Sequence, residues 1–590
     1  MSSTHTIWGL GFSDSSRPLL ERLRQAQLVQ VTVHNDETPG PGTVLQQQWH
    51  QAETFVVVAA CGLVIRLIAP LMRGKEVDPA VVVLDPNGRF AIPLLGGHAA
   101  GGEALSQRLA AALGGTAVIT GSSGATGRLA LDTLGTAWGW RRGGGNWNAL
   151  MHKAARQPVT LQQFGGLTAW RGLAAAEEML VTPASDDGAD VVVSERLGPG
   201  CRWHPPRLWL GMGCERHTSL ELLERLLSET LEAHGLAQEA VAGLASIDRK
   251  GDEPALLELA ASHGWPLKLF SAPRLAPVQV PNPSAVVERE MGTASVAEAA
   301  ALLAAGPHSS LRVAKTILQS KGQGAATLAV AAALQQWAPH RGALHLVGSG
   351  PGDLSLLTPE AREVLSRCTV WVGYGLYLDL LEPLRRPDQL RLDGQLTRER
   401  ERCQQALQLA CQGTPVALVS SGDSGIYGMA GLALELWLEL DDADRPDFAV
   451  HPGLSALQLA AARCGAPLMH DFCTISLSDR LTPWAVIERR LLAAAQGDFV
   501  VALYNPRSLG REWQLARAIA MLLQGRPGST PVALARQLGR PDESVSLHTL
   551  ETLPIAQVDM LTLVLVGNSS TRAAAGRLVT PRGYPGAELS

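Results

Sequence analysis

Glycines at alternate positions are the first residues of this sequence whose spacing could serve a ligand. Gly348, Gly350 and Gly352 surround Pro351 and precede Asp353. Since glycine has no side chain, such a loop can turn sharply and present bare backbone N–H and C=O groups. No Gly-Lys-Ser/Thr follows, so this is not a Walker A loop, and the spacing differs from the dinucleotide fingerprint. Taken alone, the loop fits either a ligand contact or a tight strand-to-helix turn.

The segments on each side of this loop are a strand and a helix. The apolar run 343–347 has the length of a buried strand. Thr358, Pro359 and Glu360 have the residue types of an N-cap, a first helical position and a first turn. Strand, glycine loop and helix in succession predict an α/β unit with a cleft at the carboxyl end of the strand.

The same arrangement recurs along the C-terminal half, where five further predicted strands each end in a small, turn-forming loop. The strand and loop pairs are 369–373 with 374–381, 415–420 with 421–431, 448–450 with 451–462, 499–503 with 504–508, and 560–566 with 567–572. In open α/β sheets the carboxyl ends of strands face one crevice. We therefore expect these loops to converge on a single ligand.

The chemistry of these loops is that of positioning more than of acid and base. They contain no Ser-His-Asp order, no H-E-x-x-H and no carboxylate cluster with metal-ligand spacing, so no metal site is predicted. A transferase with an already activated donor, such as a sulfonium methyl donor, fits this profile. The alternative is a nucleotide-binding regulatory module, which the absent lysine and the absent acidic ribose partner disfavour.

Length and composition limit the remaining classes of function. With 590 residues, 46% hydrophobic and 18% charged, the chain predicts several globular domains. Its net charge of -5 gives no footprint for nucleic acid. The first residues lack a basic start followed by an apolar core, and no apolar run could cross a bilayer, so we expect a cytoplasmic protein without a membrane partner. The eight cysteines form no C-x-x-C pair, which predicts reduced thiols.

The N-terminal half contains weaker signals. A glycine-rich loop with His98 runs into a predicted helix within 94–113, which suits a carboxylate-bearing ligand or a close-packed turn. Tryptophans and arginines alternate over 138–147, which predicts an irregular, exposed segment. Ser295 and Glu298 have capping-box spacing, so Glu298 has a structural alternative to any acid-base role.

The C-terminal half resembles precorrin-3B C(17)-methyltransferases, class III S-adenosylmethionine enzymes of cobalamin biosynthesis. The likeness rests on GSGPGDLSLLTPEA, VGYGLYLDLL, SSGDSGIYGMAGL, APLMHDFCTISLSDRLTPW, YNPRS and DMLTLVLVGNS in this order. It implies a two-lobed α/β fold with S-adenosylmethionine between the lobes, a tetrapyrrole substrate and a homodimer. The implied cofactor contacts are Pro351, Gly422, Asp423, Ser424, Tyr427, Ser455, Ala456 and Asn505.

The reaction of this family methylates C-17 and contracts the macrocycle, and contraction needs a proton donor or acceptor. Asp353, Asp423, His470 and Asp479 are the catalytic candidates that lie on the implied cleft side. Each could equally stabilise its own loop, and Asp353 could accept backbone N–H groups of its turn.

The N-terminal half resembles cobalt-precorrin-5A hydrolases, which open a lactone and release acetaldehyde. CGLVIRLIAP, LLGGHAAGGEAL, GMGC, SIDRKGDE, NPSAVV and GTASVAEAAAL carry this likeness, although Glu103 stands where the family usually has asparagine. The resemblance implies His98 and Glu298 as acid-base candidates, and Arg66 and Lys250 as ligands of substrate carboxylates.

Together the sequence patterns and the two resemblances predict a multidomain α/β protein whose C-terminal half has the class III tetrapyrrole methylase fold. The expected parts are a hydrolase-like domain at 1–138, a middle irregular region at 139–204, a second hydrolase-like α/β domain at 205–334, a linker at 335–341 and a methyltransferase at 342–590, with lobes at 342–450 and 451–590. The expected function is bifunctional: methyl transfer and lactone hydrolysis. The alternative is a methyltransferase alone, with a degenerate N-terminal half that binds substrate.

Overall fold

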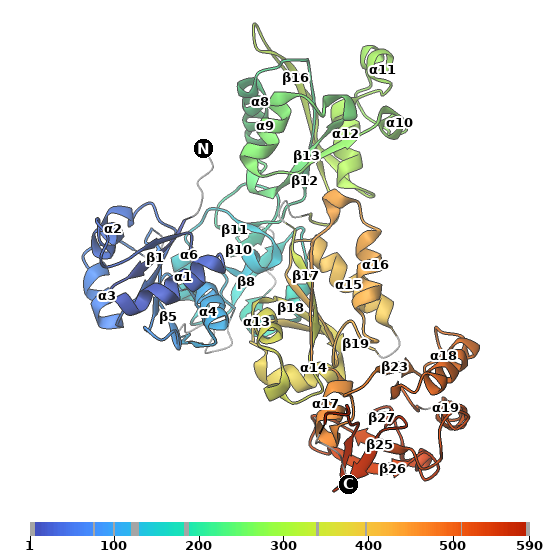
Figure 1. Cartoon of the computed structure of the whole chain (residues 1–590). Coiled ribbons are helices and arrows are strands. Elements are labelled where there is room, and N and C mark those ends of the chain that lie inside the picture. The colour runs from blue at the N-terminus through green and yellow to red at the C-terminus, as the bar shows by residue number, and fades with distance from the viewer. Residues whose placement is uncertain are drawn as a thin grey trace.

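The protein is seen here in a computed structural model that describes residues 6–74, 77–97, 101–119, 129–181, 188–337, 341–395, 398–508 and 510–585. Figure 1 shows four bodies along the chain: one coloured blue, one cyan, one green, and a two-lobed yellow-to-red part that ends at the C-terminus. Mixed α/β architecture over several sheets is confirmed. In the part of the chain that the structure describes, no helix is both long and apolar enough to span a membrane.

The first body is a six-stranded sheet with helices on both faces. Its order is β2 (Val31–Val33), β1 (Ile7–Gly11), β3 (Thr54–Val58), β4 (Ala80–Leu84), β5 (Phe90–Leu95) and β6 (Thr116–Ala117). The accompanying helices are α1 (Arg17–Gln25), α2 (Pro41–Gln48), α3 (Cys61–Ile68) and α4 (Gly102–Leu113). β3 and β4 are buried along their whole length, as expected of strands with both faces covered.

The middle region is an ordered sheet with a buried core, and the prediction of an irregular, exposed segment there is wrong. Five short strands form a sheet in the order β7 (Arg141–Arg142), β11 (Cys201–His204), β10 (Val191–Val193), β8 (Val159–Gln163) and β9 (Leu180–Val181), with α6 (Trp147–Ala154) and α7 (Ala174–Met179) beside it. Trp138, Trp140 and Trp147 are buried in its core. The interleaved glycines suggested exposure, but two of them allow close packing against β11: a side chain at Gly143 would collide with the His204 ring, and one at Gly145 with the backbone of Cys201.

The third body is another five-stranded sheet, which lies above the middle region in Figure 1. Its order is β14 (Leu267–Phe270), β13 (Val241–Ile247), β12 (Leu208–Cys214), β16 (Gly324–Ala332) and β15 (Ser310–Ser320). The main helices are α8 (Leu220–Ala233), α9 (Pro254–His263) and α12 (Val296–Ala305), with the shorter α10 (Ala272–Leu275) and α11 (Ala285–Met291). α8 and α9 share one apolar core with the sheet, and α12 contributes to another.

The first lobe of the C-terminal part is a sheet of five parallel strands. Its order is β19 (Leu390–Gly394), β18 (Val370–Tyr374), β20 (Val416–Ser420), β17 (Ala343–Gly348) and β21 (Asp447–His451). The helices are α13 (Pro359–Arg367), α14 (Gly375–Leu381), α15 (Glu399–Cys411) and α16 (Ala430–Leu438). β17, β18 and β20 share one continuous apolar core with α15, α16 and the middle region. The parallel arrangement puts all five carboxyl ends on one edge, as predicted.

The second lobe is mostly antiparallel. Its sheet order is β23 (Phe472–Ser476), β24 (Val500–Tyr504), β27 (Thr562–Val566), β25 (Pro531–Arg536) and β26 (Ser544–Thr549), with α17 (Ala456–Cys464), α18 (Trp484–Gln496) and α19 (Gln514–Leu522). The expectation that the loop 567–572 joins the crevice is wrong. β27 runs antiparallel to β24, so the carboxyl end of β27 points away from the crevice. At that end Ser569 donates hydrogen bonds from its backbone N and from Oγ to the Asp498 carboxylate. The residues just before β27 face the crevice instead.

Gln336, within the predicted linker, joins the middle region to the C-terminal part. Its side chain is 1% exposed. Its oxygen accepts from Trp140 Nε1 at 2.6 Å and from Leu167 N at 2.8 Å, and its nitrogen donates to the carbonyl oxygens of Trp138 and Gln412, both at 2.7 Å. One amide side chain therefore satisfies four polar groups, of which three are buried and one, Leu167 N, is partly buried.

Replacing Gln336 by leucine is expected to lower the free energy of unfolding by about 2–5 kcal/mol. Leucine has a similar volume but leaves these four polar groups unpaired, and each buried one costs about 1–3 kcal/mol before local relaxation. Urea denaturation of the full chain measures the loss. Its exposed neighbour in sequence, Gln335, provides the control: Gln335→Leu removes one contact, to Gln412, and we expect a change below about 1 kcal/mol. Equal effects of the two substitutions would contradict this account.

The stability of the protein is expected to depend on pH through His345, a histidine on β17. His345 Nδ1 lies 3.0 Å from His451 Nε2, and His451 Nδ1 lies 2.6 Å from Glu360 Oε1. Burial lowers the pKa of His345 from 6.5 to about 4. Between these values the unfolded chain binds a proton that the folded chain does not, so stability falls as pH drops from 6.5 towards 4. Chemical denaturation of His345→Leu across this window should show a shallower decline than the parent, and an unchanged slope would refute the assignment.

Candidate active site between two lobes

Three loops from the first lobe meet through their main chains. Gly350 and Gly422 exchange backbone hydrogen bonds at 3.1 and 2.8 Å, which joins the loop after β17 to the loop after β20. Gly453, after β21, packs against both: a side chain there would collide with the carbonyl oxygen of Gly422 and the backbone of Gly348. Glycine is required at 453 because the obstructing atoms are backbone and cannot rotate away.

The carboxylate of Asp423 also holds these loops together. Its Oδ1 accepts from Gly425 N at 2.8 Å within its own loop, and its Oδ2 accepts from Gly453 N at 3.1 Å in the next. Asp423 also lines the cavity described below. In this position it fixes the shape of the loops, and it remains a predicted cofactor contact and catalytic candidate.

Three residues other than glycine adopt left-handed backbone conformations at this site. Tyr427, Asn505 and Gln537 have φ values of 54°, 49° and 48°. Tyr427 is held by a hydrogen bond from its hydroxyl to the Thr474 carbonyl at 3.0 Å, which links the two lobes. Asn505 donates from Nδ2 to Ser476 Oγ at 3.1 Å. Such conformations cost about 1–3 kcal/mol each and gather at functional sites.

A cavity of about 200 Å³ lies where these loops face the second lobe. Its wall includes seven of the eight residues predicted to contact the cofactor: Pro351, Gly422, Asp423, Tyr427, Ser455, Ala456 and Asn505. The eighth, Ser424, is fully buried behind the loop and does not line this cavity. Ser455 has a further task, because its hydroxyl caps α17 in a complete capping box with Gln458.

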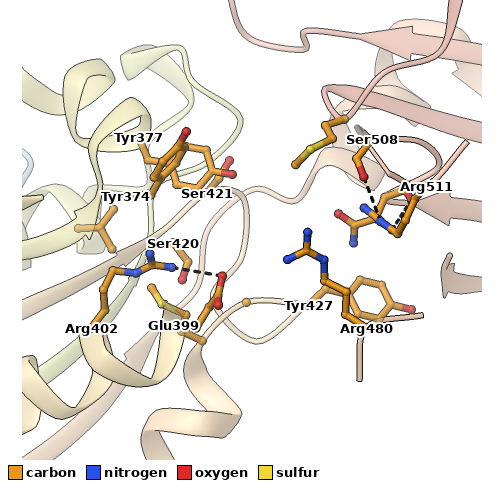
Figure 2. Close-up of a pocket in the computed structure, with 15 residues that line it drawn as sticks. Tyr374, Tyr377, Glu399, Arg402, Ser420, Ser421, Tyr427, Arg480, Ser508 and Arg511 are labelled. Atoms are coloured by element: carbon orange, nitrogen blue, oxygen red, sulfur yellow. Dashed lines mark hydrogen bonds and ion pairs between the residues drawn. The ribbon is translucent and has the colours of Figure 1, made fainter. Parts of the chain in front are cut away.

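A second cavity, of about 450 Å³, adjoins the first and shares Tyr377, Ser421, Tyr427, Asn505 and Met560 with it. Figure 2 shows Tyr374, Tyr377, Glu399 and Arg402 on the side of the first lobe, and Arg480, Ser508 and Arg511 across from them. Aromatic rings and three guanidinium groups from both lobes suit a flat acceptor with carboxylates on its rim.

The polar groups of this second cavity differ in how they are satisfied. Arg402 lies 3.5 Å from Glu399, and Arg511 donates to Ser508 Oγ at 3.1 Å and to the Asn505 carbonyl at 3.2 Å. Burial lowers the pKa of Arg511 and raises that of Tyr377. The hydroxyl of Ser420, at the end of β20, is buried without a hydrogen-bond partner among the described residues. A buried hydroxyl at the edge of a cavity can take its hydrogen bond from an ordered water or from a ligand.

The other three catalytic candidates of the C-terminal half lie outside both cavities. Asp353 accepts from Ser355 N at 2.8 Å, and this bond lowers the pKa of its carboxyl. His470 is exposed, with Nε2 2.9 Å from the Pro581 carbonyl. Asp479 accepts from Gln514 Nε2 at 3.1 Å. All three have contacts that stabilise a loop or a segment, which is the alternative that the sequence left open.

The candidates of the N-terminal half lie in two different bodies. His98 falls outside the described residues, and Arg66 is exposed on α3 of the first sheet. In the third body Lys250 is buried, and its Nζ lies 3.3 Å from Glu253 Oε2. Lys250 therefore already has a carboxylate partner.

Glu298 is fully buried in that third body, near the start of α12. It accepts hydrogen bonds from Asn282 N, Asn282 Nδ2 and Lys315 N at 2.8–3.1 Å. Ser295 caps α12 as expected, but the Glu298 carboxylate turns to Asn282 and Lys315, where it ties two segments together. Its contacts are therefore those of a structural residue.

Sequence reasoning assigned no role to the residues of the second cavity apart from Tyr427 and Asn505, which line both cavities. Arg480 lies inside a motif that carried the family resemblance, and Tyr374 and Tyr377 lie in another. Arg402 and Arg511 come from a helix and a loop with no motif, and Met560 precedes β27, whose direction the sequence does not reveal. An arginine within a loop motif, such as Arg480, was the signal in the sequence that could have indicated this cavity.

Comparison with known families divides the chain in the order of these bodies. Residues 43–124 match the family described as Cobalamin synthesis G N-terminal, and residues 208–331 match Cobalamin synthesis G C-terminus. Residues 343–554 match Tetrapyrrole (Corrin/Porphyrin) Methylases.

Two curated relatives align with the C-terminal part over nearly their whole length. A probable cobalt-factor III C(17)-methyltransferase of Salmonella typhimurium is 48% identical over 243 residues, which are 41% of this chain and 99% of the relative. A precorrin-3B C(17)-methyltransferase of a Sinorhizobium species is 42% identical over 253 residues, 42% of this chain and 98% of the relative. The crystal structure of the methyltransferase CobJ is 36% identical, with a TM-score of 0.39 over 41% of this chain and all of that one.

Proposed function

Because the chain belongs to the tetrapyrrole methylase family, we propose that its C-terminal part methylates C-17 of a precorrin-type tetrapyrrole, with contraction of the ring. The observation that carries this proposal is a pair of adjoining cavities between the lobes. One is lined by residues that follow β17, β20, β21 and β24, and the other by tyrosines and arginines from both lobes. This is the arrangement that brings a small donor against a large, flat, acidic acceptor.

The residues present fit S-adenosylmethionine, the methyl donor of this family. The close contacts between the loops of Gly350, Gly422 and Gly453 place Pro351 and the main chain of 421–423 on the wall of the first cavity, which we propose as the donor cavity. Asn505 and the main chain on either side of Ser455 lie on the same wall. We propose that these groups hold the donor, and that the unpaired Ser420 hydroxyl bonds a ligand at the junction with the acceptor cavity.

S-Adenosylmethionine supplies a methyl group that is already activated by its sulfonium. The protein therefore has to align acceptor and donor and to keep water out, and it needs no strong base for the transfer itself. Tyr427, whose hydroxyl reaches the second lobe, stands in the wall common to both cavities and can orient both substrates. Arg402, Arg480 and Arg511 can bind the carboxylates of the acceptor and so fix which ring carbon faces the donor.

The proposal is tested by incubating the full chain with S-adenosylmethionine carrying a ¹³C-labelled methyl group and a tetrapyrrole acceptor. We expect the label at C-17 of the product in carbon NMR. Supplying the acceptor with and without cobalt, in parallel, identifies which form is used. Label at another carbon, or none with either acceptor, would contradict the proposal.

A second activity is favoured by the two matches to cobalamin synthesis G domains. We propose that the N-terminal half opens the lactone of cobalt-precorrin-5A and releases acetaldehyde. Coupled assay of acetaldehyde with the full chain tests this proposal, and a chain that methylates but yields no acetaldehyde would identify the half as a binding module. We also propose a homodimer, twice 62.5 kDa, which sedimentation equilibrium would reveal.

A further inference from the structure

A cavity of about 430 Å³ lies outside the methyltransferase cleft, between the middle region and the third body. Its lining comes from the ends of β8 and β10, the turn into β11, and β15 of the neighbouring sheet. Figure 1 shows the cyan strands β8, β10 and β11 below and to the left of β12 of the green body. None of the residues that line it lines either cavity between the lobes.

The charges of this cavity are unbalanced in favour of cations. Its lining includes three arginines and one carboxylate, which gives 3 − 1 = +2. The carboxylate, Glu195, is buried, and it is already bound by Arg312 at 2.9 Å and by the buried Arg207 at 3.3 Å. It is therefore unavailable to neutralise the other two arginines, Arg196 and Arg202.

Those two arginines have no carboxylate partner among the described residues. Arg202 donates to the carbonyl oxygens of Pro199 and Arg196 at 3.1 and 3.3 Å, which are neutral acceptors. Arg196 lies on the exposed turn after β10, and only its backbone takes part in recorded hydrogen bonds. Arg202 also donates to Ser194 Oγ at 3.5 Å, again a neutral acceptor. Two guanidinium groups that lack a carboxylate partner on one wall can bind the carboxylates of a ligand.

Apolar surface accompanies these charges. Phe164 is 57% exposed and Leu197 is 52% exposed, and both line the cavity. Phe164 is held in place through its carbonyl, which accepts from Arg207 at 3.3 Å. A large exposed aromatic side chain beside guanidinium groups without carboxylate partners suits a ligand with an apolar face and an anionic rim.

We propose that this cavity is a second tetrapyrrole site, in which Arg196 and Arg202 bind the carboxylates of the macrocycle and Phe164 lies against its flat face. The choice of a tetrapyrrole as the ligand rests on the proposed function, because a protein that methylates tetrapyrroles encounters them as its substrates. The cavity itself rests only on its charges, its exposed rings and its volume. Its place beside the third body fits a site that presents substrate to the hydrolase-like half.

Titration of the full chain with uroporphyrin III, an octacarboxylate porphyrin, tests this proposal. Equilibrium dialysis should give two molecules bound per chain. The double variant Arg196→Gln, Arg202→Gln should bind one, with affinity for the lost site reduced at least about tenfold for each arginine. Arg156→Gln, an exposed arginine of the same middle region with no recorded side-chain contact, is the matched control and should still bind two.

Two further arms separate this proposal from the proposed function. The double variant should transfer methyl groups at the same rate as the parent. Loss of the second binding site with methyl transfer intact would support the second tetrapyrrole site. Absence of methyl transfer in the parent would contradict the proposed function and would leave the second site untouched. Benzenehexacarboxylate should not displace the porphyrin at equal concentration. Any of three results would overturn the second tetrapyrrole site. The double variant could still bind two porphyrins, Arg156→Gln could lose one bound porphyrin as the double variant does, or benzenehexacarboxylate could displace the porphyrin.

Discussion

Gly453→Ala is expected to weaken binding of S-adenosylmethionine by about 10- to 100-fold. The added methyl group would overlap the Gly422 carbonyl and the Gly348 backbone, so the three loops must separate. Forcing a methyl group into well-packed structure costs about 1–3 kcal/mol, and each 1.4 kcal/mol is a factor of ten in affinity. The shift would also stretch the bond from Gly453 N to Asp423. Isothermal titration calorimetry with the full chain measures the change.

The control for this substitution is Gly431→Ala, on the exposed face of α16 in the same lobe. A side chain at this position meets no atom within 4 Å. Alanine in a helix is favoured over glycine by roughly 0.5–1 kcal/mol, so the control should be as stable as the parent or more so and should bind the donor normally. Unchanged donor affinity in Gly453→Ala would mean that the meeting of the loops has no part in binding.

Arg480→Ala is expected to lower kcat/KM for the tetrapyrrole by about 10- to 100-fold, chiefly through KM. Arg480 lines the acceptor cavity from the second lobe and has no recorded carboxylate partner among the described residues. Hydrogen bonds to charged groups contribute about 1.5–3 kcal/mol, which corresponds to that loss. Donor affinity should stay the same, because Arg480 does not line the donor cavity. Steady-state methyl transfer at varied acceptor concentration measures both constants.

Arg489→Ala, an exposed position on α18 of the same lobe, removes a similar charge away from both cavities and serves as the control. We expect it to retain the parent's kcat/KM. If Arg480→Ala reduced donor affinity instead of acceptor affinity, the two cavities would have to exchange their proposed roles.

Much of the donor cavity was predictable because parallel strands repeat a simple rule. Apolar runs followed by glycine-rich loops place their loops on one edge of a sheet, and β17, β20 and β21 follow this rule. Seven residues assigned to the cofactor by motif consequently lie around one cavity. The roles of these residues remain predictions.

The rule failed where strands are antiparallel. The loop after β27 was expected in the crevice, but an antiparallel strand exchanges its two ends, and strand direction depends on pairing partners far away in the sequence. The middle region was misread for a related reason. Its tryptophans are interleaved with arginines and glycines, a local pattern of exposed chain. They are buried by tertiary packing, against one another and in the core that the middle region shares with the C-terminal part.

The acceptor cavity was hidden because its residues converge from distant elements. Arg402 lies on α15 and Arg480 and Arg511 lie in loops of the second lobe, so no spacing along the chain links them. A single arginine on a helix suggests an ion pair with a neighbour on the same helix, and Arg402, although buried, does lie 3.5 Å from Glu399.

Hydrogen–deuterium exchange of the full chain, with and without S-adenosylmethionine, tests most directly whether the loop ends bind the donor. We predict slower exchange in four separate segments on donor binding: 349–353, 421–428, 453–457 and 504–508. The N-terminal sheets, which are not part of the cleft, should exchange unchanged. Protection confined to one of these segments, or found instead in the N-terminal half, would contradict a donor site built from converging strand ends.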